Sequence, residues 1–229
     1  RGGDDYTHTA WVASRSIQYM KERAQEGRPF LCVSGIYSPH SPWVAPQRFL
    51  DLYDPNKVTL PSFPPEADEK RNADHYSDGE LRLARQGYYG MVSEVDHHVG
   101  RMLDSLDELG MADETIVVFT ADHGEWLGEH LKYGKGYPGH DCVSRVPLLM
   151  RVPGKEGGRR VSGLVEGVDV VPTLLEACGA PVPPHLQGQS LCPVLNGGED
   201  PDKEIALMEF TGWKMIRSVD YRYVIHAEG

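Results

Sequence analysis

Apolar residues recur at helical spacing in two long stretches of the chain. In residues 9–26 they are spaced so that they share one face of a helix, and Gly27 follows directly. A longer stripe of the same kind runs over residues 88–109 and ends before Gly110. Glycine ends a helix well because it adopts the left-handed backbone of a C-terminal cap at little cost. The pattern predicts one helix over each stretch.

Three short apolar runs predict buried strands instead. They cover residues 30–36, 115–121 and 147–152. The second run, TIVVFTA, is rich in β-branched residues and lacks polar alternation, which is typical of a strand buried on both faces of a parallel sheet. Because such runs alternate with helical stretches, they predict a layered α/β domain.

The pattern changes toward the end of the chain. Residues 170–179 predict a further helix, with Pro172 in its first turn and Gly179 at its end. After a pair of glycines come three short strand-like runs, at residues 205–210, 213–217 and 221–226. Their close spacing predicts an antiparallel meander.

We therefore expect two parts in the chain. Residues 1–203 would form the α/β domain, and residues 204–229 would begin a small antiparallel subdomain. Within the first part, residues 38–78 are rich in Pro, Asp and Tyr and show no sustained period. Loops of this length are usually functional.

Composition narrows the class of protein. The chain has 229 residues, 40% of them apolar, and a formal net charge of −11. This balance argues against a nucleic-acid partner, which needs a basic surface. No run approaches the roughly 20 apolar residues of a membrane span, and the four cysteines form no CxxC pair. We expect a globular protein with a sizeable core, and its compartment is left open.

A candidate ligand site follows the second predicted strand. Asp122, His123 and Gly124 come directly after residues 115–121. Ligands of open α/β sheets bind at the carboxyl ends of strands, and a carboxylate beside an imidazole offers oxygen and nitrogen ligands to a cation. The alternative is a turn in which Asp122 caps the next segment and His123 lies on the surface. The short signal alone slightly favours the turn.

A lysine lies downstream in a stretch dense in Gly, His and Lys. Lys135, between two glycines, is poorly placed to pack in a core but well placed to present a compact charge to an anion. A solvated surface lysine is the alternative. His130 with Asp122 suggests a zinc site only weakly, because no third nitrogen or sulfur ligand is evident.

Motifs spread over nearly the whole chain carry a more specific signal. They are SPHSPW (38–43), YYGMVSEVDHHVGRMLDSLDELGMADETIVVFT (88–120), FTADHGEWLGEH (119–130), KYGKG (132–136), SRVPLLMRVPG (144–154), VDVVPTLLEACGAPVP (168–183), QGQSLCPVL (187–195) and WKMIRSVDYRYVIH (213–226). In this order they resemble blocks of the sulfatases, a branch of the alkaline phosphatase superfamily. Several collinear blocks are far more specific than any one alone.

The resemblance implies a fold and a chemistry. The fold would be an α/β, alkaline-phosphatase-like layered sheet with helices on both faces. Asp122 and His123 would bind one divalent cation, which is usually calcium in this family, with magnesium as the alternative. Lys135 would bind the sulfate oxygens, and His40 would contact the sulfate and protonate the leaving oxygen. Because calcium prefers oxygen ligands, Asp122 is the more natural ligand, and His123 would then face the sulfate. The substrate would be a sulfated small molecule or sugar.

One part of the family pattern is missing. The nucleophile of sulfatases is a Cys or Ser in a C/S-x-P-x-R motif, converted to formylglycine, and none of the four cysteines here has that setting. Asp4 and Asp5 follow no strand, so we do not assign them to the family's paired metal ligands. We therefore expect the C-terminal portion of a sulfatase, inactive by itself and able to pair with another chain through exposed sheet surface.

Two other functions are left open. A phosphonate or phosphate ester hydrolase of the same superfamily would use the same turn and lysine, and a non-catalytic fragment would only bind or fold. His97 and His98 are expected on the polar face of the long helix. Roles for His140 and Asp141 are open, and three aromatics in predicted loops would either line a pocket or be partly buried: Trp43, Trp126 and Tyr137.

Overall fold

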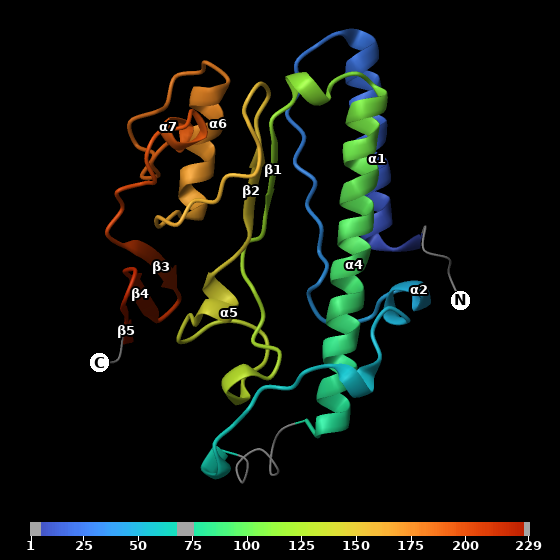
Figure 1. The fold of residues 1–229 in the computed structure, drawn as a ribbon, viewed down its shortest axis with the longest axis vertical. Helices are drawn as coiled ribbons and strands as arrows, with labels where there is room; N and C mark the ends of the chain where they lie inside the picture. The colour runs from blue at the N-terminus through green and yellow to red at the C-terminus, as the bar shows by residue number, and fades with distance from the viewer. Residues whose placement is uncertain (1–5, 68–75, 227–229) are drawn as a thin grey trace. The chain divides into compact units, whose positions relative to one another are not determined.

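The computed structural model describes residues 6–67 and 76–226, so Asp4 and Asp5 lie outside the described residues. The chain divides into two compact units (Figure 1). The first unit comprises Arg1–Thr115 and Glu125–Gly134, and the second comprises Ile116–Gly124 and Lys135–Gly229. The fold class is α/β as predicted, with helices, strands and a small antiparallel sheet at the end of the chain.

Two long helices dominate the first unit. Helix α1 (His8–Glu26) begins where the Thr7 side chain accepts from the amide of Ala10, and it ends at Gly27, whose φ is 61°. Helix α4 (Asp78–Glu108) begins with a capping box between Ser77 and Glu80. Both helices confirm the predictions from apolar spacing.

A short helix and two 3-10 turns also belong to the described part of the first unit. Helix α2 (Gln47–Leu50) packs on α4, and Phe49, Ala45 and Met91 form a buried cluster there. The turns are η2 (Pro55–Lys57) and η3 (Ala112–Glu114). Part of the long region predicted as a loop is therefore buried against α4.

One residue on α4 lies on a different face from the one predicted. His98 is only 2% exposed, and its Nδ1 lies 3.0 Å from Arg101 Nη1. His97, in contrast, is exposed as expected. The buried face of α4 also includes Glu94, so polar residues occupy positions that a purely apolar stripe would not assign to the core. The expectation that both histidines are on the polar face is wrong for His98.

The strand predicted at residues 30–36 is not formed. This segment carries no strand pairing among the described residues. The segment nevertheless packs alongside α1. The Ser34 hydroxyl lies 2.7 Å from that of Ser16, and the Phe30 ring packs edge-on against Tyr19. On its other side Leu31 and Val33 are 76% and 85% exposed. The prediction of a buried strand is therefore wrong for this segment, because apolar composition alone does not supply the neighbouring strand that pairing needs.

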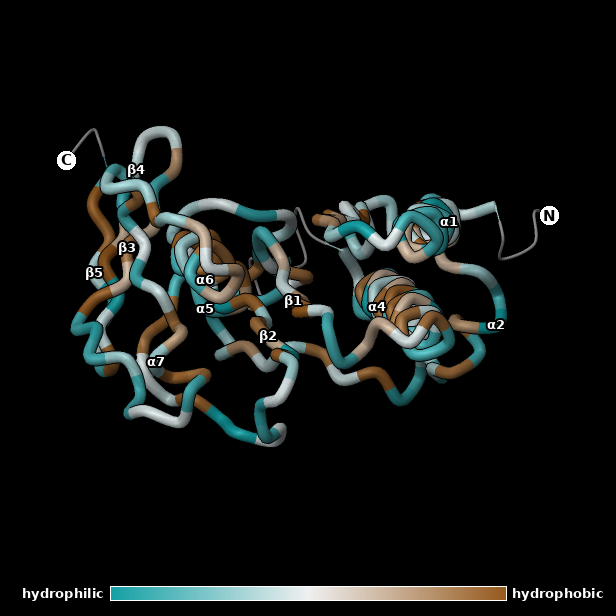
Figure 2. Tube along the Cα trace, turned by 90° about the horizontal axis from the view of Figure 1, so that it is seen from above, coloured by the Kyte–Doolittle hydropathy of each residue, from teal (hydrophilic) through white to brown (hydrophobic). Residues whose placement is uncertain are grey.

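The second unit contains the remaining predicted strands. Strand β1 (Val117–Thr120) pairs with β2 (Leu148–Arg151) in an antiparallel register that places Thr120 opposite Leu148. The expected parallel pairing and burial on both faces are therefore wrong for β1, where Phe119 is 38% exposed. Figure 2 shows hydrophobic residues along both strands. Local sequence indicates an apolar strand but not the direction of its partner.

The rest of the second unit follows the prediction closely. Helix α6 (Val170–Ala177) precedes Gly179, whose φ is 70°, and the short helices are α5 (Asp141–Ser144) and α7 (Cys192–Leu195). Strands β3 (Ala206–Phe210), β4 (Trp213–Arg217) and β5 (Arg222–His226) form the expected antiparallel meander. Two 3-10 turns, η4 (Glu129–Leu131) in the first unit and η5 (Gly167–Asp169) in the second, complete the elements. Across the described residues no helix combines the length and apolarity needed to cross a membrane.

Candidate functional site

The turn after β1 is fixed by a close backbone approach. Asp122 follows β1 by two residues, and the amide of Gly124 donates to the carbonyl of Val143 at 2.7 Å. A Cβ at Gly124 would lie 2.0 Å from the carbonyl oxygen of Cys142, which is far inside van der Waals contact. Only glycine fits this position, so the sequence after the strand holds the turn against α5.

The His123 ring is oriented by its own neighbour. Its Nδ1 lies 2.7 Å from the carbonyl oxygen of Gly124, which can only accept, so the proton of the ring is on Nδ1. Its Nε2 is then an acceptor and lies 2.9 Å from the Nζ of Lys135, which donates. The lysine side chain is therefore directed to the turn by a histidine lone pair.

Asp122 completes this group of three side chains. One carboxylate oxygen accepts from the amide of His123 at 2.9 Å, and the other lies 3.6 Å from the His123 Nε2. The Asp122 side chain is 87% exposed, whereas that of His123 is 23% exposed. Three of the four predicted site residues thus meet within the second unit, where a cation and a carboxylate flank one imidazole nitrogen.

His40 belongs to the first unit. Its Nδ1 lies 2.8 Å from the carbonyl oxygen of Ser41 and 2.7 Å from the hydroxyl of Tyr37. Tyr37 also donates to the Ser41 carbonyl at 2.9 Å. These contacts place the His40 ring proton on Nδ1 and leave Nε2 as the acceptor. The expected convergence of His40 with Lys135 stays a prediction.

A family model described as Sulfatase matches residues 3–180. The chain belongs to the sulfatase family. A multifunctional alkaline phosphatase superfamily protein, PehA of Trinickia caryophylli, is 32% identical over 225 residues, covering 86% of this chain and 43% of that protein. An ulvan-active sulfatase of Formosa agariphila is 31% identical, covering 92% of this chain and 42% of that protein. The chain thus spans less than half the length of these curated relatives.

Solved structures agree with this assignment. The phosphonate monoester hydrolase of Agrobacterium radiobacter superposes with a TM-score of 0.86 at 27% sequence identity. The match covers 99% of this chain and 53% of that one. The alkaline-phosphatase-like fold implied by the motifs is therefore confirmed.

The donor set at the turn fits only part of a cation site of the sulfatase type. Calcium binds through about 6 to 8 oxygen atoms. The described residues bring one carboxylate and one imidazole to this turn, and none of their His, Cys, Asp and Glu side chains gather in threes to hold a metal. Because Nε2 of His123 accepts a hydrogen bond from Lys135, the exposed carboxylate oxygens of Asp122 are better placed to bind a cation. Further oxygen ligands would have to come from elsewhere.

The segment between the turn and Lys135 is held by Glu125 and Trp126 in the first unit. Glu125 accepts from the amides of Leu127 and Gly134, and the amide of Trp126 donates to the carbonyl of Gly134 at 3.0 Å. Trp126 is 2% exposed, so it packs in the unit rather than lining a pocket. Its ring also meets that of His130.

The contacts that hold the Lys135 loop on its other side were not anticipated from sequence. Asp141, whose role was open, forms ion pairs with Arg217 and Arg222. Gly139 lies against the ring of Trp213. These partners are more than 70 residues away along the chain, and no local pattern marks them.

Proposed function

We propose that the protein to which this chain contributes hydrolyses sulfate esters, and that the chain supplies the anion-binding part of the site. The observation that carries this proposal is the 2.9 Å contact between Lys135 Nζ and His123 Nε2 at the end of β1. It joins two residues that the sulfatase motifs mark and that lie 12 positions apart. The ulvan-active sulfatase relative supports sulfate as the anion and a sulfated sugar as the substrate class.

The residues of this chain would act mainly through charge. Lys135 would bind the sulfuryl oxygens and stabilise the charge that builds on them as the sulfur–oxygen bond breaks. His123 would hold Lys135 in position through Nε2. His40 would deliver a proton to the leaving oxygen, which requires its ring to be protonated at Nε2 when substrate is bound. Asp122 would hold a calcium or magnesium ion, which would add positive charge beside the sulfate.

The attacking group is proposed to lie outside this chain, as a formylglycine. Positioned charge alone cannot replace an activated nucleophile in line with the leaving oxygen. Among the described serines, Ser34 and Ser38 are hydrogen-bonded to Ser16 and Thr9, and neither has a neighbouring base among these contacts. We therefore propose that the isolated chain does not turn over sulfate esters, and that it pairs with further polypeptide.

The test is turnover of an aryl sulfate by the full-length protein. Lys135→Ala should lower kcat/KM by about 100- to 1000-fold, as for loss of one oxyanion-binding group. Lys155→Ala is the matched control, because Lys155 is an exposed lysine in another loop of the same unit. Equal activity of both variants would refute the role of Lys135.

A second function has specific support. The phosphonate monoester hydrolase of Agrobacterium radiobacter shares this fold at 27% identity, and PehA carries the description multifunctional. Lys135 and an Asp122-bound cation would serve a phosphonate or phosphate monoester as well as a sulfate. Parallel kcat/KM measurements on aryl sulfate and aryl phosphonate esters decide between them. If kcat/KM is higher for the phosphonate ester than for the sulfate ester, the phosphonate becomes the proposed substrate.

A further inference from the structure

We propose that the C-terminal sheet β3–β5 positions Lys135, with Asp141 and Trp213 as the positioning residues. The inference rests on the proposed anion-binding role of Lys135. It concerns residues 137–141, which follow the lysine and contact the sheet, and of which Asp141 is the first residue of α5. Close packing, a ring contact and two ion pairs within the second unit carry it.

The sequence around Lys135 provides little restraint of its own. Gly134 and Gly136 flank the lysine with φ values of 75° and 111°. A Cβ added at either glycine would meet nothing within 4 Å. Glycine restricts the backbone little. The position of the Lys135 ammonium group therefore depends on the contacts made by the residues before and after it in the loop. One attachment is the Gly124 turn, which holds His123.

The sheet provides the other attachment through a tight backbone contact. A Cβ at Gly139 would lie 2.7 and 2.9 Å from two ring carbons of Trp213 and 3.3 Å from the sulfur of Met208. Trp213 is 5% exposed and opens β4. The Tyr137 ring, two residues from Lys135, lies edge-on to Trp213 with 6.1 Å between centroids. The loop therefore rests directly on the side chains of β3 and β4.

Two arginines of the sheet hold the end of the loop by charge. Asp141 lies 3.5 Å from Arg217 Nη2 on β4 and 3.8 Å from Arg222 Nη1 on β5. The Asp141 side chain is 38% exposed, and those of the arginines are 33% and 24% exposed. Ion pairs with this much solvent contribute little to stability. Their effect is to fix the direction in which the loop leaves the sheet.

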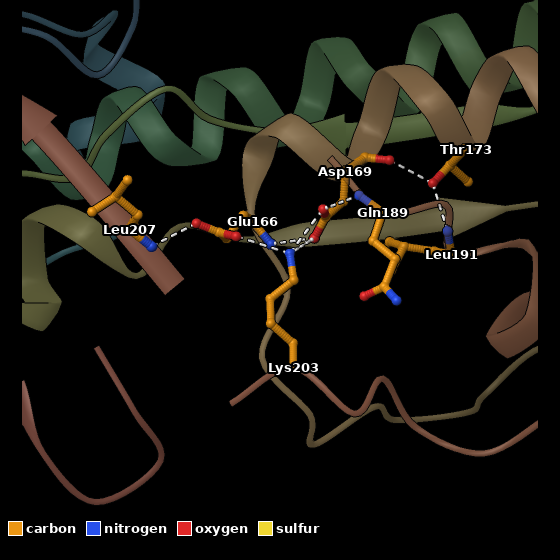
Figure 3. Close-up of polar contacts among 7 residues, drawn as sticks. All are labelled: Glu166, Asp169, Thr173, Gln189, Leu191, Lys203 and Leu207. Atoms are coloured by element: carbon orange, nitrogen blue, oxygen red, sulfur yellow. Dashed lines mark hydrogen bonds and ion pairs between the residues drawn. The ribbon is translucent and has the colours of Figure 1, made fainter. Parts of the chain in front are cut away.

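The sheet is itself fixed to the layer of α6 by a closed polar network (Figure 3). Lys203 Nζ lies 2.7 Å from an Asp169 carboxylate oxygen and 2.8 Å from Glu166 Oε2. The other oxygen of Glu166 accepts from the amide of Leu207, the second residue of β3, at 2.6 Å. The sheet is thus anchored to this network through β3, and Met208 and Trp213 of the same sheet contact the lysine loop.

A double-mutant cycle in the full-length protein tests the inference, using whichever ester it turns over best. Asp141→Asn keeps the shape of the side chain and removes its charge. We expect kcat/KM to fall about tenfold, mainly through KM, with a matching rise in the Ki of inorganic sulfate or phosphate. Asp141→Glu should recover part of the loss. In a Lys135→Ala background Asp141→Asn should have no further effect, because it acts through the lysine.

The matched control is Glu209→Gln, which breaks the exposed ion pair with Lys214 on the same sheet. It should leave KM and Ki unchanged, and thermal unfolding of each variant checks that folding is retained. Trp213→Phe should raise KM in the same direction as Asp141→Asn. An unchanged Ki in Asp141→Asn, or an equal loss in both backgrounds, overturns the inference alone. Full activity of Lys135→Ala overturns the proposed function as well.

Discussion

Lys203 closes a polar network around the Asp169 carboxylate, with its Nζ 2.8 and 2.7 Å from the two oxygens of a side chain that has no exposed surface. The amides of Glu166 and Gln189 donate to the same carboxylate at 2.8 and 2.7 Å. Both oxygens of the Asp169 carboxylate therefore accept hydrogen bonds from groups of the protein itself. A buried charge of this kind is tolerated only when it is paired and hydrogen-bonded.

Asp169→Ala should lower the free energy of unfolding by about 3 kcal/mol or more, because it leaves Lys203 without its main partner and two amides without an acceptor. Denaturant titration measures the change. Glu209→Ala is the comparison, since its ion pair with Lys214 is exposed and should cost less than about 1 kcal/mol. Similar losses in both variants would show that the network adds nothing to stability.

The same network predicts a loss of stability at alkaline pH. Burial acts to lower the pKa of Lys203, but its hydrogen bonds with Asp169 and Glu166 outweigh burial and raise the pKa above its ordinary value of 10.5. This stabilisation is complete below pH 10.5 and is lost as pH rises through the raised pKa. Lys203→Arg should flatten the decline, because arginine stays charged there. The measurement is the free energy of unfolding of the unsubstituted protein and of Lys203→Arg, from neutral pH upward. An equal decline in both proteins would contradict the prediction.

Gly124→Ala should disturb the candidate site through the backbone. The new Cβ would meet the Cys142 carbonyl at 2.0 Å, so the turn that carries Asp122 and His123 must move. We expect a loss of about 1 to 3 kcal/mol in stability, as for other overpacked positions, together with loss of ester hydrolysis by the full-length protein. Gly100→Ala is the control, because its Cβ would enter open space on α4 and should stabilise by about 0.5 to 1 kcal/mol. Unaltered activity in Gly124→Ala would show that the turn is not constrained.

Calcium should bind weakly to this chain alone. One carboxylate and one imidazole supply few of the about 6 to 8 oxygens that the ion prefers. Isothermal titration should give a dissociation constant of about 10⁻⁴ M or weaker, and Asp122→Asn should remove the remaining heat. Asp113→Asn, in the exposed η3 turn, is the control. Micromolar affinity would mean that the chain holds a complete cation site.

Helices and apolar runs were predictable because their signals are local. The spacing in residues 9–26 and the glycine after it suffice for α1, whereas the apolar stripe at residues 88–109 predicted only part of α4, which begins ten residues earlier at Asp78. Strand pairing is not local. The segment 30–36 had the composition of a strand but has no partner among the described strands, and β1 has an antiparallel one.

The candidate site divides in the same way. The Asp-His-Gly turn was visible from its place after an apolar strand, and Lys135 from its flanking glycines, but only the family motifs linked the two. The supporting contacts could not be foreseen, because each joins distant positions. Asp169 and Lys203 are 34 residues apart, and Asp141 and Arg217 are farther still. Such pairs depend on the tertiary fold, so no periodic pattern in the sequence indicates them.

The hydrogen bond from His123 Nδ1 to its neighbour's carbonyl determines what the ring can offer to a ligand. In this tautomer the Nε2 lone pair accepts one N–H of the Lys135 ammonium, so the imidazole offers no hydrogen-bond donor on that side. An ammonium group carries three N–H groups and the histidine engages one of them, so two would be left to bind an anion. An anion bound to Lys135 would therefore approach from the side turned away from the imidazole, because the Nε2 lone pair and the Asp122 carboxylate beside it both repel negative oxygen.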